Sequence, residues 1–278
     1  MRNAMLATME EWQRRIEAYC KEYDIPIEYL ANTLYEPKVV PMIRGKAFEF
    51  SVLLALQGIL DEHTWRVSKT PMNAQQGAHD IDVNITHLSS GRAINVECKL
   101  AGKGRFRHQS SGSSEISVKC MRSRTLGEAM VKALAPRFHV TEAQLKVHND
   151  QYLPGDFDVV ITSIGNAFYE TDPNTGFFTW TPTSDGIAFL EALRAKYGIS
   201  PEMPLKDFAF SQMYIAKASD LAVANNGVRC TRRRCTKKRN CGFIPNYPVI
   251  TFTTETLEPQ TPWHYLSNAV RVLDGFVE

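Results

Sequence analysis

Acidic side chains and one lysine occur at alternate positions in two short segments of the chain. The segment HDIDV contains Asp80 and Asp82, and the later segment VECK contains Glu97 and Lys99. Alternate residues of a β-strand share one face, so each pair would point to one side while the apolar residues between them point to the other. Several carboxylates held together are costly to desolvate unless a cation neutralises them. Because hard divalent cations take oxygen ligands, the pattern predicts a Mg²⁺ site beside an amine.

The chemistry expected of such a site is hydrolysis of a phosphodiester. A bound divalent ion polarises the phosphate and lowers the pKa of bound water, while Lys99 can orient or deprotonate the attacking water. The alternative is an ordinary amphipathic hairpin, on whose surface the same charges pair as cross-strand salt bridges. A test of metal dependence separates the two.

The two segments are predicted to be the strands of one β-hairpin. The runs HDIDVNITHL and RAINVECKL alternate apolar and polar residues on either side of a turn at Ser89-Ser90-Gly91. If the turn is centred between its last two residues, Asp82 pairs with Lys99 and Asn84 pairs with Glu97. The acids and the lysine would then converge.

Helix and strand patterns surround this hairpin. The sequence predicts a helix over 44–60, a short strand over 64–69 and then a polar loop. After the hairpin, the basic stretch GKGRFRHQSSGSSE is expected to be mobile without a ligand, and SRTLGEAMVKALAPRF is expected to be a helix. The continuous apolar run over 157–164 predicts a strand that is buried on both faces.

Further elements are predicted at the two ends of the chain. Apolar residues at helical spacing indicate a helix over 5–22. Towards the C-terminus, GFFTWTPT, FAFSQMYIAKA and YPVITF are expected to be strands. The segments SDGIAFLEALRAKYG and WHYLSNAVRVLDGF are expected to be helices.

This order of elements resembles the αβββαβ core of the PD-(D/E)XK nuclease superfamily, over about residues 44–165. The resemblance implies an α/β fold with a restriction-endonuclease-like core, a mixed central sheet flanked by helices, and C-terminal additions. It also implies Asp80 or Asp82 as the metal-binding acid of the second strand. Glu97 would be the second metal ligand and Lys99 the catalytic lysine.

Two details of the resemblance concern individual acids. Many members of the superfamily place a glutamate on the first core helix, and Glu49 occupies that place here. Its alternative is an exposed helix residue near Lys46. No proline precedes Asp80, which departs from the family's motif, and the doublet with Asp82 leaves the choice of acid open.

Within this superfamily the chain looks most like a type II restriction endonuclease of a restriction-modification system. Its 278 residues contain no helicase or P-loop motif, which argues against a nucleotide cofactor. The resemblance implies a Mg²⁺-dependent, sequence-specific endonuclease of double-stranded DNA, working as a homodimer because a symmetric site needs two active sites. The alternatives are another PD-(D/E)XK nuclease of repair or mobile elements, or a noncatalytic zinc-stabilised DNA-binding protein.

Positive charge is concentrated in one segment, and we call residues 229–239 the basic segment. The whole chain carries a net charge of +2, and the basic segment contributes seven positive charges and no negative one. The rest of the chain therefore carries +2 minus 7, or −5. Such a segment is typical of a polyanion binder, although it could also be a solvated loop. Its seven basic residues are Arg229, Arg232, Arg233, Arg234, Lys237, Lys238 and Arg239. Further candidate DNA contacts after the hairpin are Lys103, Arg105, Arg107, Arg122 and Arg124.

Three of the six cysteines lie in or beside the basic segment, in CTRRRCTKKRNC. Cys230, Cys235 and Cys241 suggest a structural Zn²⁺ site, although their spacing is not that of a standard zinc ribbon. His264, or a cysteine from elsewhere in the fold, is the candidate fourth ligand. The other histidines, including His148, show no metal-ligand spacing. The alternative is three reduced thiols in a DNA-contacting loop.

These patterns predict three regions within the chain. Residues 1–43 would be a helical segment that packs on the core, residues 44–200 the nuclease core, and residues 201–278 a C-terminal elaboration. No apolar stretch approaches the roughly 20 residues that a membrane span requires. Since the N-terminus also lacks the pattern of a signal peptide, we expect a soluble protein in the cytoplasm of a bacterial or archaeal cell.

Overall fold

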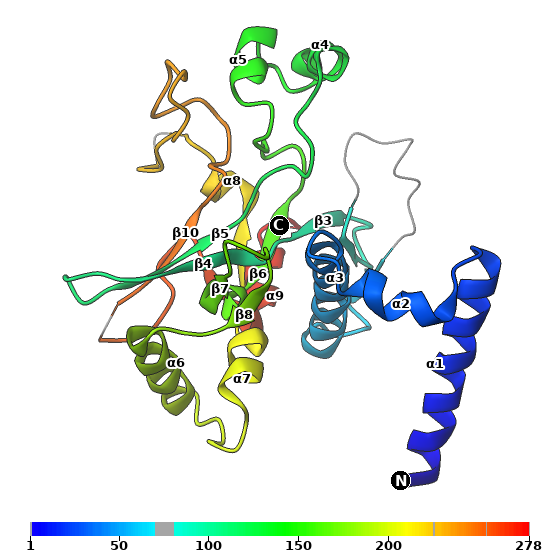
Figure 1. Cartoon of the computed structure of the whole chain (residues 1–278). Coiled ribbons are helices and arrows are strands. Elements are labelled where there is room, and N and C mark those ends of the chain that lie inside the picture. The colour runs from blue at the N-terminus through cyan, green and yellow to red at the C-terminus, as the bar shows by residue number, and fades with distance from the viewer. Residues whose placement is uncertain (1, 70–80, 225, 254, 278) are drawn as a thin grey trace. The chain divides into compact units, whose positions relative to one another are not determined.

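The computed structural model describes residues 2–69, 81–224, 226–253 and 255–277, with side chains from residue 11 onward. The chain divides into two compact units, Met1–Ala47 and Phe48–Glu278. Figure 1 labels many of their helices and strands, numbered in chain order. Asp80, one of the two candidate acids, lies outside the described residues.

The first unit is helical. α1 (Arg2–Glu22) and α2 (Ile27–Leu34) precede α3 (Val39–Ile59), whose first residues belong to this unit. The helix expected over 5–22 is therefore confirmed. Cys20 is buried, whereas many large apolar side chains of this unit are exposed: Trp12, Tyr19, Tyr23, Ile27, Tyr29, Leu34, Tyr35, Met42 and Ile43.

A six-stranded mixed sheet forms the centre of the second unit, in the spatial order β1, β2, β3, β6, β9, β11. β3 and β6 run parallel, and the other neighbouring pairs run antiparallel. The expected α/β class with a mixed sheet is thereby confirmed. The strands are β1 (Trp65–Ser68), β2 (Val83–His87), β3 (Ala93–Cys98), β6 (Val159–Ser163), β9 (Met213–Lys217) and β11 (His264–Tyr265).

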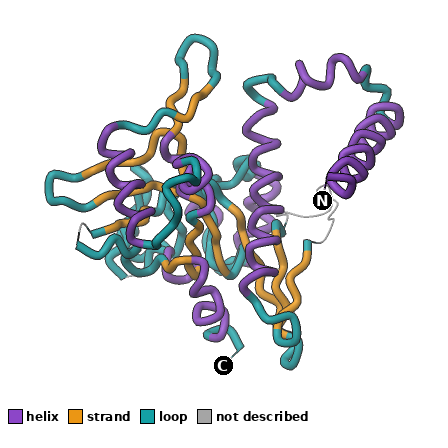
Figure 2. The backbone as a smooth tube through the Cα atoms, turned by 90° about the horizontal axis from the view of Figure 1, so that it is seen from below, coloured by secondary structure: helices purple, strands orange, loops and turns teal. Residues whose placement is uncertain are grey.

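Helices α3 and α9 (Ala269–Asp274) pack on one face of this sheet. Val52 and Leu56 of α3 share an apolar cluster with Val96 of β3 and Ile161 of β6. Figures 1 and 2 show α3 running beside the strands. Because α3 is held in this way, the glutamate that it carries at position 49 is brought close to the sheet.

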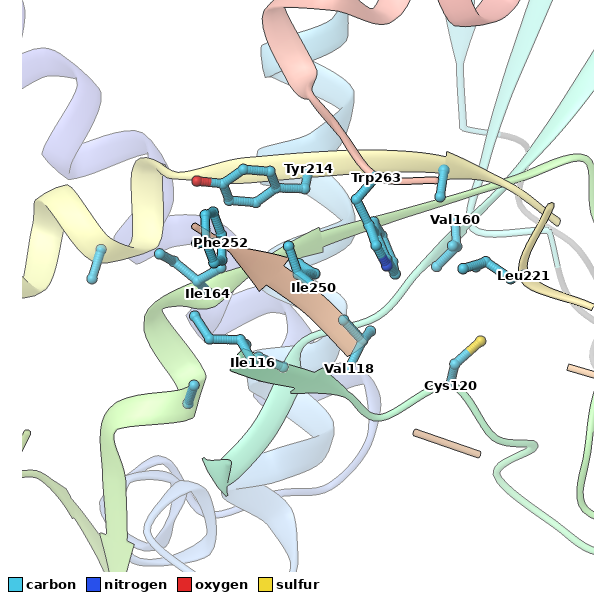
Figure 3. Close-up of a cluster of buried hydrophobic side chains, with 14 of the residues drawn as sticks. Ile116, Val118, Cys120, Val160, Ile164, Tyr214, Leu221, Ile250, Phe252 and Trp263 are labelled. Carbon is cyan, nitrogen blue, oxygen red and sulfur yellow. The ribbon is translucent and has the colours of Figure 1, made fainter. Parts of the chain in front are cut away.

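The other face is covered by a second, three-stranded sheet in the order β10, β5, β4. Val160 of β6 and Tyr214 of β9 pack here against Ile116 and Ile250, as Figure 3 shows. Val159 and Ile161, the neighbours of Val160, pack on the α3 face because successive strand residues point to opposite sides. The elements of this layer are β4 (Ala101–His108), β5 (Ser114–Val118), β10 (Val249–Phe252), α6 (Ser184–Lys196) and α7 (Leu205–Ser211).

A third apolar cluster joins α4 (Glu128–Arg137) and α5 (Glu142–Val147) to the C-terminal part of the chain. Leu145 of α5 packs in it with Phe243 and with three cysteines, Cys230, Cys235 and Cys241. The remaining elements are β7 (Tyr169–Thr171), β8 (Phe178–Trp180), α8 (Ala218–Leu221) and the 3₁₀ turns η1 (Ile164–Phe168) and η2 (Leu266–Asn268).

The hairpin of β2 and β3 is present, but its register differs from the expected one by two residues. Asn84 pairs with Asn95, and Val83 pairs with Val96. The expected pairing of Asn84 with Glu97 was therefore wrong. A shift of two residues keeps every side chain on its face, so the acids and the lysine still point to the same side.

The basic stretch after the hairpin is ordered as β4 and β5, contrary to the mobile segment that we expected. The pairing of these strands shifts between Ala101 and Phe106, as at a β-bulge. Gly104 has a φ of +63°, and a Cβ on Gly102 would lie 2.6 Å from Cγ of Arg105. The glycines that suggested mobility therefore fit an irregular strand that larger residues would disturb.

Two C-terminal segments also differ from expectation. FAFSQMYIAKA begins as α7 and becomes β9 only at Met213, and WHYLSNAVRVLDGF begins with β11 before α9. The short apolar runs fitted either type of element, and packing in the sheet decides between them. Among the described residues, none of the helices combines the length and apolar character that crossing a membrane requires.

Candidate functional site

Three carboxylates that are distant in sequence meet at the sheet, and we call them the acidic site: Glu49 of α3, Asp82 at the start of β2, and Glu97 of β3. All three are buried, with exposed fractions of 6%, 8% and 2%. Burial and then the charges of Glu97 and Glu49 raise the pKa of Asp82 to about 7, against the backbone N–H of Cys98 and the charge of Lys99. Crowded carboxylates of this kind are suited to a divalent cation.

Asp82 is fixed by β3, the strand that carries Glu97. Its Oδ2 accepts a hydrogen bond from the backbone N–H of Cys98 at 2.8 Å. Cys98 lies between Glu97 and Lys99, and its side chain packs on the opposite face with the α3 cluster. The alternation of side chains along β3, continued to Lys99 directly after it, therefore directs Glu97 and Lys99 towards Asp82.

Lys99 forms an ion pair with Oε1 of Glu97. Burial by itself lowers the pKa of Lys99, but the adjacent carboxylate of Glu97 outweighs burial and the pKa is raised. Lys99 is therefore an ammonium ion at neutral pH. In this arrangement it can donate hydrogen bonds and supply positive charge.

Two further residues contact the acidic site, and neither was expected from the sequence. The hydroxyl of Tyr152 donates a hydrogen bond to Oε1 of Glu97 at 2.9 Å. Lys69, at the end of β1, pairs with Glu49 and donates to the backbone carbonyl of Asp82 at 3.2 Å. Tyr152 lies 55 positions from Glu97, so no local pattern could mark it.

The three cysteines converge with His148 to form a second centre, which we call the Cys–His cluster. One ligand atom from each of the four buried residues lies within 4.8 Å of the other three. Tetrahedral zinc with bonds of about 2.0–2.3 Å places its ligands roughly 3.5–3.8 Å apart, so a small closure would complete the site. These four residues could therefore hold a metal ion such as zinc.

The fourth residue of this cluster was not the expected one. His264 lies on β11, where it pairs with Ile215 of β9. His148, which had no ligand spacing in the sequence, follows α5 and stacks on Phe243 at 4.1 Å. Burial lowers the pKa of His148, which favours the neutral, metal-binding imidazole.

Gln151 orients the imidazole of His148. Its Nε2 donates to the carbonyl of Ile244 at 2.8 Å, so its Oε1 faces Nδ1 of His148, 2.6 Å away. The same nitrogen lies 4.0 Å from Sγ of Cys230, so Gln151 holds the ring beside the cysteines. Burial also raises the pKa of Cys241 to about 12, so metal binding at neutral pH would release protons from the thiols.

The basic segment is divided between one anchored arginine and an exposed group. Arg232 pairs with Asp150, and its Nε donates to Oε1 of Gln151 at 3.3 Å. A surface depression of about 300 Å³ is lined by Lys146, Val147 and residues 232–234. The exposed basic residues of the segment are Arg229, Arg233, Arg234, Lys237, Lys238 and Arg239.

The other candidate DNA contacts have different surroundings. Lys103, Arg105 and Arg107 are exposed on β4, and Arg124 is exposed before α4. Arg122 is buried, with an ion pair to Asp156 at 2.5 Å and a hydrogen bond to the carbonyl of Gln151. In this structure Arg122 therefore has a packing role.

Comparison with family models, with curated proteins and with solved structures gave no match to this chain. Its chemistry is therefore inferred from its own side chains. The acidic site offers oxygen ligands and a lysine ammonium, and the Cys–His cluster offers sulfur and nitrogen ligands. The two centres suit different metal ions, because hard cations prefer oxygen and zinc accepts thiolate and imidazole.

Proposed function

We propose that this chain is a Mg²⁺-dependent nuclease of the PD-(D/E)XK superfamily, which hydrolyses phosphodiester bonds in double-stranded DNA. The observation that carries the proposal is the convergence of Glu49, Asp82, Glu97 and Lys99 in one buried site. A chance Glu-X-Lys sequence on a surface hairpin would leave these side chains exposed and the helix glutamate elsewhere.

The order of elements also supports this superfamily. α3, β1, β2, β3, α4 and β6 follow each other in the chain, with β3 parallel to β6 and antiparallel to β2. This order resembles the αβββαβ order of the restriction-endonuclease-like core, and the resemblance supports the proposal. The strands β4 and β5 are inserted between β3 and α4, and they pack on the sheet face opposite α3, the face to which Glu97 points.

Each side chain would have a distinct part in the reaction. Asp82, Glu97 and Glu49 would hold the cation, and Asp82 would do so only once it had lost its proton. A divalent cation bound there would supply Lewis-acid polarisation of the scissile phosphate. Lys99 would orient the attacking water and stabilise negative charge that develops on the phosphate oxygens.

DNA is the substrate that the charge distribution favours. Six exposed basic residues of the basic segment and three on β4 provide the sequence-independent attraction to phosphates. Side chains of the C-terminal additions would read base edges, as in a type II restriction enzyme acting in the cytoplasm. Exposed aromatic side chains of the first unit, such as Trp12 and Tyr19, would suit the contact surface of a homodimer.

Zinc is the ion that we propose for the Cys–His cluster. Three sulfur atoms and one imidazole form a donor set that binds zinc in closed structural sites. A noncatalytic zinc-stabilised DNA-binding protein would share this cluster and the basic segment. It would have no use for the acidic site, so cleavage distinguishes the two functions.

The deciding experiment is incubation of purified protein with plasmid DNA, with Mg²⁺ and with a chelator. Discrete fragments that form only with Mg²⁺ support a sequence-specific nuclease, and a smear supports a nuclease without sequence preference. Glu97→Gln should abolish cleavage, whereas Glu170→Gln, at an exposed position of β7, should not. Cleavage by Glu97→Gln, or none by the wild type on any DNA tested, would overturn the proposal.

A further inference from the structure

One short segment connects the two centres described above. Residues 148–152 begin with His148, a member of the Cys–His cluster, and end with Tyr152, whose hydroxyl donates to Glu97. Four peptide links therefore separate a candidate zinc ligand from a contact of the acidic site. If the ends and the middle of so short a segment are held, a displacement of His148 also displaces Tyr152.

The middle of the segment is held from the N-terminal side by Arg122. The backbone N–H of Arg122 donates to the carbonyl of Asp150 at 2.9 Å, and its Nε donates to the carbonyl of Gln151 at 3.1 Å. The guanidinium lies 4.9 Å from the ring centre of Tyr152. The buried Arg122 thus fixes the peptide and the ring together.

The C-terminal part of the chain holds the same segment from the other side. Arg232, between Cys230 and Cys235, pairs with Asp150 and donates to Gln151. Asn246 donates to Oδ2 of Asp150 at 2.9 Å, and the N–H of Ile244 donates to the carbonyl of Tyr152 at 2.9 Å. The loop that carries the cysteines is therefore anchored on residues 148–152.

Tyr152 is well placed to orient Glu97. Its hydroxyl and Nζ of Lys99 both bind Oε1 of that carboxylate, and Lys99 lies 5.5 Å from the centre of the tyrosine ring. Phe157 packs edge-on against the ring at 5.2 Å. With the ring held on these sides, the hydroxyl limits the rotation of the Glu97 carboxylate.

We propose that Tyr152 is a positioning residue for Glu97, and that zinc in the Cys–His cluster holds Tyr152 in place through residues 148–152. This inference rests on the proposed function, since it assigns Glu97 to a divalent-cation site. Zinc would thus act at a distance: it would align a ligand of the catalytic cation as well as folding the basic segment.

Tyr152→Phe tests the first half, because it removes the hydroxyl and keeps the ring. Mn²⁺ prefers oxygen ligands, so its binding to the full-length protein without DNA, followed by the EPR signal of free Mn²⁺, reports on the acidic site. Loss of an outer hydrogen bond to a ligand typically weakens metal binding 10–100-fold, and we expect about tenfold. The matched control is Tyr265→Phe, whose hydroxyl donates to Gln212 at 3.0 Å. Equal Mn²⁺ affinity in both variants would overturn the role of Tyr152.

The second half is tested by removing zinc from the wild type and from Tyr152→Phe. A zinc-selective chelator should weaken Mn²⁺ binding to the wild type by about the same factor as the tyrosine substitution, and should have little further effect on the variant. Full additivity of the two effects, or no effect of removing zinc, would overturn the coupling. So would protein that contains no metal as purified.

A milder pair of variants applies if removal of zinc unfolds the protein. Arg232→Gln breaks the contacts to Asp150 and Gln151 and leaves all four cluster residues present, whereas Arg233→Gln removes the same charge from an exposed position. Only Arg232→Gln should weaken Mn²⁺ binding. Equal effects of the two would contradict the coupling.

The inference and the proposed function can fail separately. If Tyr152→Phe weakens Mn²⁺ binding but no DNA is cleaved under any condition, the positioning role stands and the nuclease proposal falls. If Glu97→Gln abolishes cleavage while Tyr152→Phe behaves like Tyr265→Phe, the nuclease stands and the positioning role falls.

Discussion

Oδ2 of Asp82 accepts a hydrogen bond from the backbone N–H of Cys98 at 2.8 Å. This hydrogen bond ties the start of β2 to the end of β3, so the acid of one strand cannot move independently of Glu97 and Lys99. It also supplies a donor that favours the ionised carboxylate, although burial and the neighbouring acids outweigh it and raise the pKa of Asp82. The hairpin therefore holds Asp82 in position while leaving it easily protonated.

The first prediction concerns the acids and the lysine. Asp82→Asn and Glu97→Gln should abolish DNA cleavage, and Lys99→Ala should lower the rate by about 10²–10³-fold, the effect of removing one donor that stabilises developing charge. Initial rates on supercoiled plasmid, with circular dichroism to check folding, measure this. Asp80→Asn, which changes the other candidate acid of this motif, should still cleave DNA. Cleavage by Asp82→Asn with none by Asp80→Asn would reverse the assignment.

The second prediction concerns pH and stability. The pKa of Asp82 is raised to about 7 in the folded chain, above its ordinary value of 3.8. Stability from the protonated carboxyl is therefore complete below the unfolded pKa and is lost as pH rises through about 7. When the pH is raised from 5 to 8 without divalent ions, the wild type should lose this stability and Asp82→Asn should not. The free energy of unfolding of Asp82→Asn should therefore rise by on the order of 3 kcal/mol relative to that of the wild type.

Urea denaturation at the two pH values measures this gain. Asp158→Asn is the matched control, because its carboxylate also accepts a backbone N–H, from Asn95 at 2.8 Å. A constant difference between Asp82→Asn and the wild type at pH 5 and pH 8 would show that Asp82 does not titrate in this range.

The third prediction concerns the exposed arginines of the basic segment. Arg233→Ala combined with Arg234→Ala should weaken DNA binding and reduce the slope of log K against log[salt] by about 2, because each neutralised phosphate adds roughly 0.9 to that slope. Fluorescence anisotropy with labelled duplex at several salt concentrations measures the slope. Arg271→Ala, an exposed arginine on α9, is the control. An unchanged slope would show that these arginines do not contact DNA phosphates and are only solvated.

The fourth prediction concerns the metal of the Cys–His cluster. Elemental analysis should find about one zinc per chain, and none in the combined variant Cys230→Ser, Cys235→Ser, Cys241→Ser. Because metal binding contributes directly to folding, a zinc-selective chelator should lower the melting temperature. His148→Ala should lose zinc, whereas His264→Ala should retain it. If His148→Ala retained zinc, His148 would not be the fourth ligand.

The sequence alone determined the mixed α/β class and the sides of the hairpin. Side chains alternate along a strand with a period of two, so Glu97 and Lys99 had to share a face wherever the turn was centred. The register was wrong by two residues, yet Asp82 still meets them because a shift of two preserves the face. The predicted face of each side chain is therefore correct even though the predicted register is not.

Only the tertiary structure decided which distant residues join each centre. Tyr152 reaches Glu97 across 55 positions, and His148 reaches Cys230 across 82. Burial of Arg122 against Asp156 likewise has no local pattern. These interactions depend on how α4, α5 and the C-terminal segment fold around the sheet, and a chain's own periodicity carries no information about pairs that only packing brings together.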